Sequence, residues 1–138
     1  MVHSITIEVS TQGFCDVIDV TPQVIAVVEK SGIKSGIVCI ANPGSTAGIT
    51  TIEFEPGAVG DLKAALEKLA PEDGHYRHND TWDDGNGFAH LRSALIGASQ
   101  SFPVREGKVA LGTWQQIVLL DFDNRPRSRK LVVSVVGE

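Results

Sequence analysis

The sequence lacks the features that mark secreted, membrane-spanning and DNA-binding proteins. It has only two cysteines, Cys15 and Cys39, which stand far apart, form no CxxC pair and read as small buried thiols. No apolar run approaches the roughly 20 residues that a membrane helix needs, and the first residues do not show a secretory signal. Basic residues are scarce, 12 against 17 acidic ones, so the net charge is -5. We therefore expect a reduced, cytoplasmic protein with no membrane or nucleic-acid partner, because binding to phosphate backbones needs a basic surface.

The residues that are present predict a single domain over residues 1–138. Of these, 42% are hydrophobic and 21% charged, which suits one globular core. We find no internal repeat, low-complexity tract or linker that would divide the chain.

Hydropathy patterns predict an α+β fold. Ile5, Ile7 and Val9 alternate with polar residues, as in a half-buried strand. A helix should follow with Thr21 as its N-cap and Gly32 as its end. Other strands are expected over residues 36–41, 49–54, 99–104, 109–123 and 131–136, and the first of these, an unbroken apolar run, predicts a central strand covered on both faces.

The other helices are expected after Pro56, ending at Pro71, and from Ala89 to Gly97. Residues 71–87 show no apolar period and are interpreted as a polar loop. The resulting order of elements lacks regular βαβ alternation, so it predicts a single domain with a largely antiparallel or mixed sheet.

Candidate chemistry is concentrated in residues 73–90. His75, His78 and His90 lie there among several aspartates, including Asp84. Imidazole and carboxylate groups are ligands for divalent metals, and His90 would be held by a rigid helix. The alternative is a solvated acidic loop whose histidines only cap and hydrogen-bond.

Two other segments contain candidate binding groups around the first predicted hairpin. The small-residue loop with Ser45 and Thr46 could expose N–H and hydroxyl groups to a phosphate, although a plain hairpin turn is the favoured interpretation. Glu53 and Glu55 would share one face of a strand, either near a cation or, more commonly, in solvent.

Later segments add aromatic and basic candidates. Trp114 and Gln115 could line a ring-binding pocket, or be a core tryptophan with a buried amide beside it. Arg125, Arg127 and the basic residues after them could bind phosphate bidentately, or could be a basic strand edge that discourages pairing between molecules.

The ordered set of segments resembles the YjbQ-like family, also described as secondary thiamine-phosphate synthases. The similarity covers nearly the whole chain, and its most specific piece is Leu111–Ile117. The other markers are residues 45–50 with Glu53, Tyr76–His78, Ala89–Leu91, Leu95–Gly97, Asp121–Asp123, Arg125–Arg127 and the terminal Gly137 and Glu138.

The resemblance implies a compact YjbQ-like α+β fold that assembles as a homotrimer, with sites near subunit boundaries. It also implies a weak or secondary activity that joins hydroxymethylpyrimidine diphosphate and a thiazole phosphate with release of diphosphate. That chemistry needs a divalent metal, such as Mg or Zn, and basic groups to neutralise the leaving group.

We assign the expected roles as follows. His78, His90 and Asp84 serve as catalytic residues, and His78 and His90 as metal ligands. The substrate-binding residues are Ser45, Thr46, Glu53, Trp114, Gln115, Arg125 and Arg127.

Two departures from the family pattern favour a different hypothesis. Gly44 stands where many relatives carry histidine, and Phe88 where relatives often carry Asp or His. A trimer that binds metal or a small phosphorylated ligand without robust catalysis is therefore the alternative, and a structural or regulatory partner protein ranks last.

Overall fold

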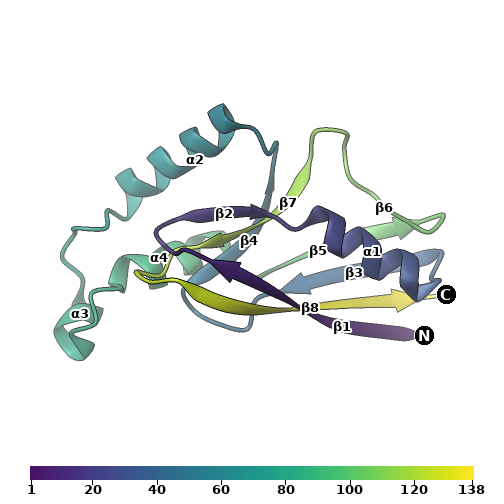
Figure 1. The fold of residues 1–138 in the computed structure, drawn as a ribbon, viewed down its shortest axis with the longest axis horizontal. Coiled ribbons are helices and arrows are strands. Elements are labelled where there is room, and N and C mark those ends of the chain that lie inside the picture. The colour runs from purple at the N-terminus through teal and green to yellow at the C-terminus, as the bar shows by residue number, and fades with distance from the viewer.

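Two antiparallel sheets form the frame of the molecule in the computed structural model, which describes residues 1–138 (Figure 1). The larger sheet has the order β1(Val2–Thr11), β8(Arg127–Gly137), β3(Ser35–Ala41), β5(Ser99–Arg105), β6(Lys108–Val109). The smaller has the order β2(Asp16–Asp19), β7(Gln116–Asp121), β4(Ala47–Ile52). Every strand pairing is antiparallel, so the predicted α+β class is confirmed and the mixed-sheet alternative does not apply.

Four helices accompany the sheets: α1(Thr21–Ser31), α2(Pro56–Leu69), α3(Arg77–Trp82) and α4(Gly87–Ile96). The first packs Val24, Val27 and Val28 into a core shared with both sheets. The other three lie at the opposite end from the two chain termini (Figure 1). None of the four is both long and apolar enough to span a membrane.

The strand covered on both faces is β7, whereas the sequence predicted this for β3. Ile117 and Leu119 of β7 enter the core beneath α1, while Val118 and Leu120 enter a second core with Phe88 of α4. In β3 only alternate residues are buried, and Ile37 is 54% exposed. Its apolar run was misleading because α1 covers only one face of the larger sheet.

Three local predictions also need correction. Val20, not Thr21, is the N-cap of α1, because the Thr21 hydroxyl accepts a hydrogen bond from the backbone N–H of Ile117. The predicted loop 71–87 contains α3, which buries none of its residues and so leaves no apolar period. The predicted strand 109–123 is divided into β6 and β7 by residues 110–115.

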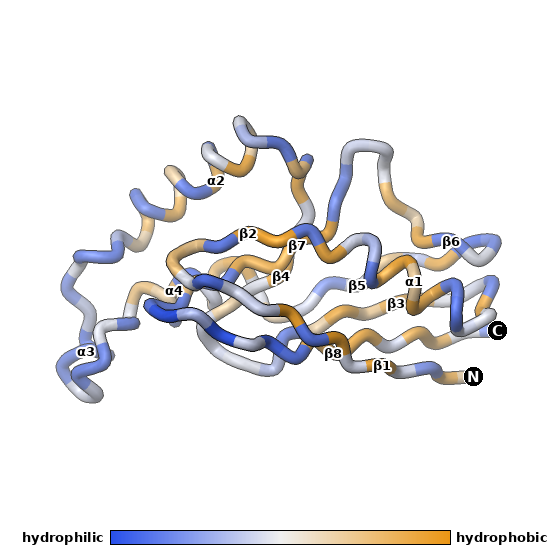
Figure 2. The backbone as a smooth tube through the Cα atoms, viewed as in Figure 1, coloured by the Kyte–Doolittle hydropathy of each residue, from blue (hydrophilic) through white to orange (hydrophobic).

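The packing of α4 against β4 positions the region where the predicted site lies. The Ser93 hydroxyl donates to the Ala47 carbonyl at 2.6 Å, and the Ile49 N–H donates to the Gly97 carbonyl. A Cβ at Gly48 would lie 2.7 Å from Cγ2 of Ile96, so glycine allows this close approach. Figure 2 shows that most residues around α3 are hydrophilic.

Candidate functional site

His78 of α3 and His90 of α4 lie side by side. Their ring centroids are 4.2 Å apart and the ring planes are tilted by 41°. Nδ1 of His78 lies 3.4 Å from Oδ1 of Asp84, and it is buried without a hydrogen-bond partner. The structure thus brings together the three residues that the sequence predicted as catalytic.

Side-chain amides hold α3 and α4 in these positions. Oδ1 of Asn79 accepts from the N–H of Gly87 at 2.9 Å, which joins the two helices. Nδ2 of Asn86 donates to Asp123, and Nδ2 of Asn124 donates to the Asp84 carbonyl. The turn after β7 therefore anchors a segment that has little apolar packing of its own.

The environment of His90 favours a neutral imidazole. Its pKa is lowered, first by burial and then by the neighbouring His78, and these effects outweigh the opposing charges of Asp84 and Asp123. A neutral imidazole at pH 7 has a lone pair available for a proton or a metal ion.

His90 faces the predicted small-residue turn across an open cavity of about 320 Å³. The cavity is lined by Gly44 and Ser45 of the turn and by His90, Ser93 and Ala94 of α4, with Gly97 and Ala98 after it. Ser45 is exposed, so its hydroxyl is accessible to a ligand. One of the two imidazoles, that of His90, therefore lies beside this turn.

Thr46 has a different role from the one predicted, because its hydroxyl is already used inside the protein. It donates to Oδ2 of Asp123 at 3.1 Å and accepts from Nη2 of Arg129 at 2.8 Å. The side chain is buried within a network of charges and is not free to bind phosphate.

That network contains one buried and one partly buried ion pair. Arg129 donates from Nε and Nη2 to both oxygens of Asp121, at 2.7 and 2.8 Å. Nη1 of Arg127 lies 2.5 Å from Oδ2 of Asp123. The Asp121 carboxylate also accepts from the Thr11 hydroxyl at 2.6 Å.

Hydrogen bonding keeps both aspartates ionised. Burial alone would raise the pKa of Asp121, but the hydrogen bonds from Arg129 and Thr11 outweigh it and the pKa is lowered. Burial likewise opposes ionisation of Asp123, and the N–H of Asn124 and the Asn86 amide outweigh it to lower that pKa.

Glu53, Trp114 and Gln115 gather at the other end of the smaller sheet. Gln115 donates to the Thr51 hydroxyl, and its Oε1 accepts from the N–H of Gly112. Trp114 is 72% exposed, so it is not the core tryptophan of the alternative interpretation. The far end of β7 is five residue steps away, about 17 Å, so one chain does not bring these residues to His90.

One further sequence prediction is wrong at this end of the molecule, and another holds only in part at β8. Glu55 caps α2 by accepting from the N–H groups of Gly57 and Ala58, and both Glu53 and Glu55 follow the end of β4 instead of sharing a strand face. The basic segment is only partly an edge, because β8 pairs with β1 from Arg127 to Val136 but is unpaired on its β3 side before Val132. Arg125 is exposed in the turn before β8.

The chain alone does not offer a complete metal centre. It contains no group of three or more His, Cys, Asp or Glu side chains placed to hold a metal ion. His78 and His90 supply two adjacent imidazoles, and Asp84 lies close to one of them. These residues do not fit a closed structural zinc site, which needs four protein ligands.

Sequence reasoning missed the burial of Asn42 and the ion pair between Asp121 and Arg129. The signal for the ion pair was present, since Asp121 follows the apolar run Ile117–Leu120 and a buried carboxylate needs a paired donor. Nothing local distinguishes Asn42, which follows the last residue of β3 and is 2% exposed.

Comparisons with known proteins give a consistent result. The family model described as UPF0047 protein YjbQ-like matches residues 5–138. A UPF0047 protein of Methanothermobacter thermautotrophicus is 38% identical over 99% of this chain and 94% of its own length. The UPF0047 protein YugU of Bacillus subtilis is 35% identical over 96% of this chain and 98% of its own.

Solved structures show the same fold. A crystal structure of a YbjQ-like protein of unknown function from Sulfolobus solfataricus has a TM-score of 0.95 at 39% identity, covering 100% of this chain and 99% of that one. An uncharacterised protein of the yjbq/upf0047 family from Clostridium acetobutylicum has a TM-score of 0.87 at 36% identity, covering 96% and 99%.

Proposed function

The chain belongs to the YjbQ-like UPF0047 family, and we propose that it is a secondary thiamine-phosphate synthase. It would join hydroxymethylpyrimidine diphosphate and a thiazole phosphate, releasing diphosphate. The observation that carries the proposal is the pairing of His78 with His90, whose ring faces the cavity at Ser45. The proposed location is the cytoplasm, which suits two free cysteines.

The proposed reaction forms one bond and breaks one. The thiazole nitrogen donates its lone pair to the methylene carbon of the pyrimidine, and the bond from that carbon to the diphosphate oxygen breaks. The oxygen keeps the bonding electrons, so the reaction needs stabilisation of the leaving diphosphate and alignment of two bound substrates.

The chain's own groups suit these tasks in different ways. The Ser45 hydroxyl would bind a phosphate oxygen beside His90, while Asp84 would position His78 from 3.4 Å. Arg125, which is exposed, and the outer part of Arg127 would contribute positive charge.

The divalent metal in the proposal, Mg or Zn, would have to share its coordination with the substrate. His78 and His90 would be its protein ligands, and phosphate oxygens would complete the set, since three protein ligands are not grouped in the chain. When bound, the metal would supply positive charge against the leaving diphosphate.

A homotrimer belongs to the same proposal. Trp114, Gln115 and Glu53 would stack on and orient the pyrimidine, but they lie at the far end of β7 from His90 within one chain. A neighbouring subunit would bring them to the histidines. The exposure of Trp114 supports this arrangement, because an aromatic ring is costly to leave in water.

Replacing the paired histidines tests the proposal directly. We expect His78→Ala and His90→Ala each to lower synthase turnover by about 100-fold or more, the typical effect of losing a group that stabilises charge developing on the leaving group. His75→Ala is the matched control, since His75 is 81% exposed and contacts only Asp80. The measurement is thiamine phosphate formation with both precursors and magnesium, and turnover like the wild type in both variants would exclude the assignment.

The alternative is a trimer that binds metal or a phosphorylated ligand without robust catalysis. The absence of a third metal ligand near His78 and His90 favours it, as does the side-chain-free Gly44. Phe88 offers no polar group to a ligand, and its ring is buried beneath Arg92 with 2% exposed. No product above a metal-free blank, together with saturable quenching of tryptophan fluorescence by thiamine phosphate, would establish this alternative.

A further inference from the structure

A second cavity lies on the other side of the turn that contains Gly44 and Ser45. It opens where β3 and β8 separate, because their pairing ends at Ala41 opposite Val132. Its volume is about 360 Å³, and no hydrophobic residue lines it. The lining consists of Asn42, Pro43, Arg127, Ser128, Arg129 and Lys130.

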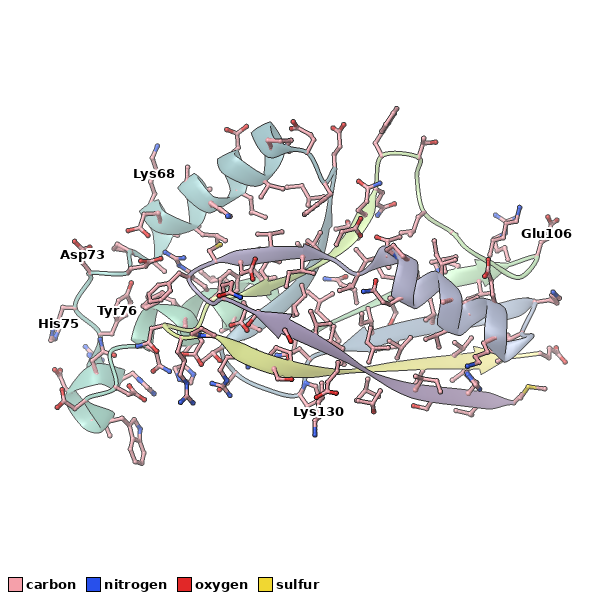
Figure 3. All side chains as sticks on the ribbon, in the orientation of Figure 1. Lys68, Asp73, His75, Tyr76, Glu106 and Lys130 are labelled. Atoms are coloured by element: carbon pink, nitrogen blue, oxygen red, sulfur yellow. The ribbon has the colours of Figure 1, made fainter.

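The cavity carries positive charge that the ion pairs hold in place. Arg127 and Arg129 contact Asp123 and Asp121 through some of their nitrogens, whereas Nη1 of Arg129 makes no hydrogen bond. Lys130 is exposed and projects from the underside of β8 (Figure 3). The ion pairs thus hold the two guanidinium groups in place and leave Nη1 of Arg129 free to donate to a ligand.

One carboxylate outside the buried pairs belongs to this surface. Glu8 of β1 is opposite Lys130 in the register, and its Oε1 accepts from the Ser128 hydroxyl at 3.3 Å. It lies on the β1 side of β8, whereas Asn42 and Pro43 form the β3 side. Cross-strand partners share one face of a sheet, so Glu8 and Lys130 lie together on the exposed face, whereas Arg129 lies on the buried face.

Asn42 supplies an independent observation. It is 2% exposed, and neither Nδ2 nor Oδ1 has a hydrogen-bond partner. Leaving a buried amide unpaired is unfavourable, and native structures contain few such groups without a functional cause. An anion in the cavity would give Nδ2 the acceptor that it lacks.

Gly44 keeps the approach to these donors open. A Cβ at this position would lie 3.3 Å from Nδ2 of Asn42 and 3.4 Å from Nη1 of Arg129. Any side chain would therefore be pressed against the two donors that have no partner. The departure from the family pattern at Gly44 thus has a local structural consequence.

We propose that this cavity binds a phosphate group, as inorganic phosphate or as the end of a small phosphate monoester. Nη1 of Arg129 and Nδ2 of Asn42 would each donate to one of its oxygens, and Lys130 at the rim would add positive charge. Phosphate suits this set because it accepts several charge-assisted hydrogen bonds at once. The site goes beyond the proposed synthase, since it lies outside the His90 cavity and does not require its reaction.

Calorimetric titration of the purified protein with inorganic phosphate tests the site. We expect saturable binding with a Kd of about 1 mM or tighter, weakening as sodium chloride is added. Asn42→Ala should weaken it at least about tenfold, and Lys130→Gln about threefold or more. The matched control is Lys68→Gln, an exposed lysine on α2 away from β8, which should bind as the wild type does (Figure 3).

The stability of Asn42→Ala separates binding from folding. If Asn42 serves a ligand, the variant should keep the wild-type melting temperature without phosphate, because it loses no hydrogen bond, and should gain less than the wild type when phosphate is added. A parallel titration with glycerol 3-phosphate distinguishes free phosphate from a phosphate monoester as the ligand. Tighter binding of glycerol 3-phosphate than of inorganic phosphate identifies a monoester.

Three results would overturn the site: no saturable binding, unchanged affinity in both Asn42→Ala and Lys130→Gln, or equal weakening by Lys68→Gln. If Asn42→Ala does not fold, Lys130→Gln alone still decides, since its side chain is exposed. Failure of the synthase assay would leave these phosphate titrations unaffected.

Discussion

Asp121 and Arg129 determine how the site end of the molecule is held. Both are almost fully buried, and four hydrogen bonds reach the carboxylate, from Arg129, Thr11 and the N–H of Asp123. A buried ion pair need not be stabilising relative to apolar packing, but breaking it leaves an uncompensated charge. Here it also fixes Thr46, directly before β4.

Asp121→Asn should therefore lower the free energy of unfolding at pH 7 by about 3–5 kcal/mol, because Arg129 is left unpaired. The pKa of Asp121 is lowered in the folded state, so its contribution is present above the unfolded value of about 3.9 and is lost as pH falls below it. Urea unfolding between pH 7 and pH 3 should show that the stability of the variant depends less on acid than that of the wild type. The acid dependence that the variant keeps should come from Asp123, whose pKa is also lowered.

The exposed carboxylate of Asp61 on α2 gives the control for this measurement. Asp61→Asn should change the free energy of unfolding by less than about 0.5 kcal/mol at any of these pH values. An Asp121→Asn curve parallel to the wild type down to pH 3 would contradict the role of the ion pair.

At the scale of elements, periodicity predicted α1, α2 and α4 but not α3. The first three bury an apolar side, which leaves a pattern in the sequence. No residue of α3 is buried, and the helix depends on Asn79 and on Asp83 in the left-handed conformation. Such polar, long-range contacts have no local signature.

The same distinction explains which part of the site was predictable. His78 and His90 stand out by residue type, and helix α4 was recognised. The separation of the two histidines from Trp114 could not be predicted, because it depends on how β7 runs through the folded protein. Which face of β3 is covered also depends on tertiary packing, and an apolar run alone does not reveal it.

The contact between α4 and β4 is tight enough to test by adding one methyl group. Gly48→Ala should lower the free energy of unfolding by about 1–3 kcal/mol, since its Cβ would lie 2.7 Å from Ile96 Cγ2 and 3.1 Å from the Gly97 carbonyl oxygen. The displaced α4 should also shift the NMR resonances of the His90 imidazole.

Gly60→Ala is the matched control, because a Cβ there meets nothing within 4 Å inside α2. It should raise the free energy of unfolding by about 0.5–1 kcal/mol through helix propensity. Ile96→Ala, which is destabilising alone, should partly relieve Gly48→Ala in a double-mutant cycle. Purely additive effects would show that the two side chains do not compete for the same space.

At the scale of the whole molecule, the residues assigned to substrate binding fall into two groups at opposite ends of the smaller sheet. Ser45 lies with the histidines, while Glu53, Trp114 and Gln115 lie beyond the other end of β7, a strand about 17 Å long. A single chain cannot close one cavity around both. If the protein is the proposed synthase, its active site must form between subunits.

Subunit complementation tests this requirement. His90→Ala and Trp114→Ala should each be nearly inactive as homo-oligomers, but co-expression in equal amounts should restore about one quarter of wild-type synthase activity. In a cyclic trimer with random assembly, each site takes its histidine from one subunit and its tryptophan from the next, and both are intact at about one site in four. His90→Ala co-expressed with His78→Ala is the control, since the two changes share one side of the interface and no arrangement restores a complete site. Activity absent from the first mixture, despite confirmed mixed trimers and inactive parents, would contradict a site shared between subunits and remove Trp114 from it.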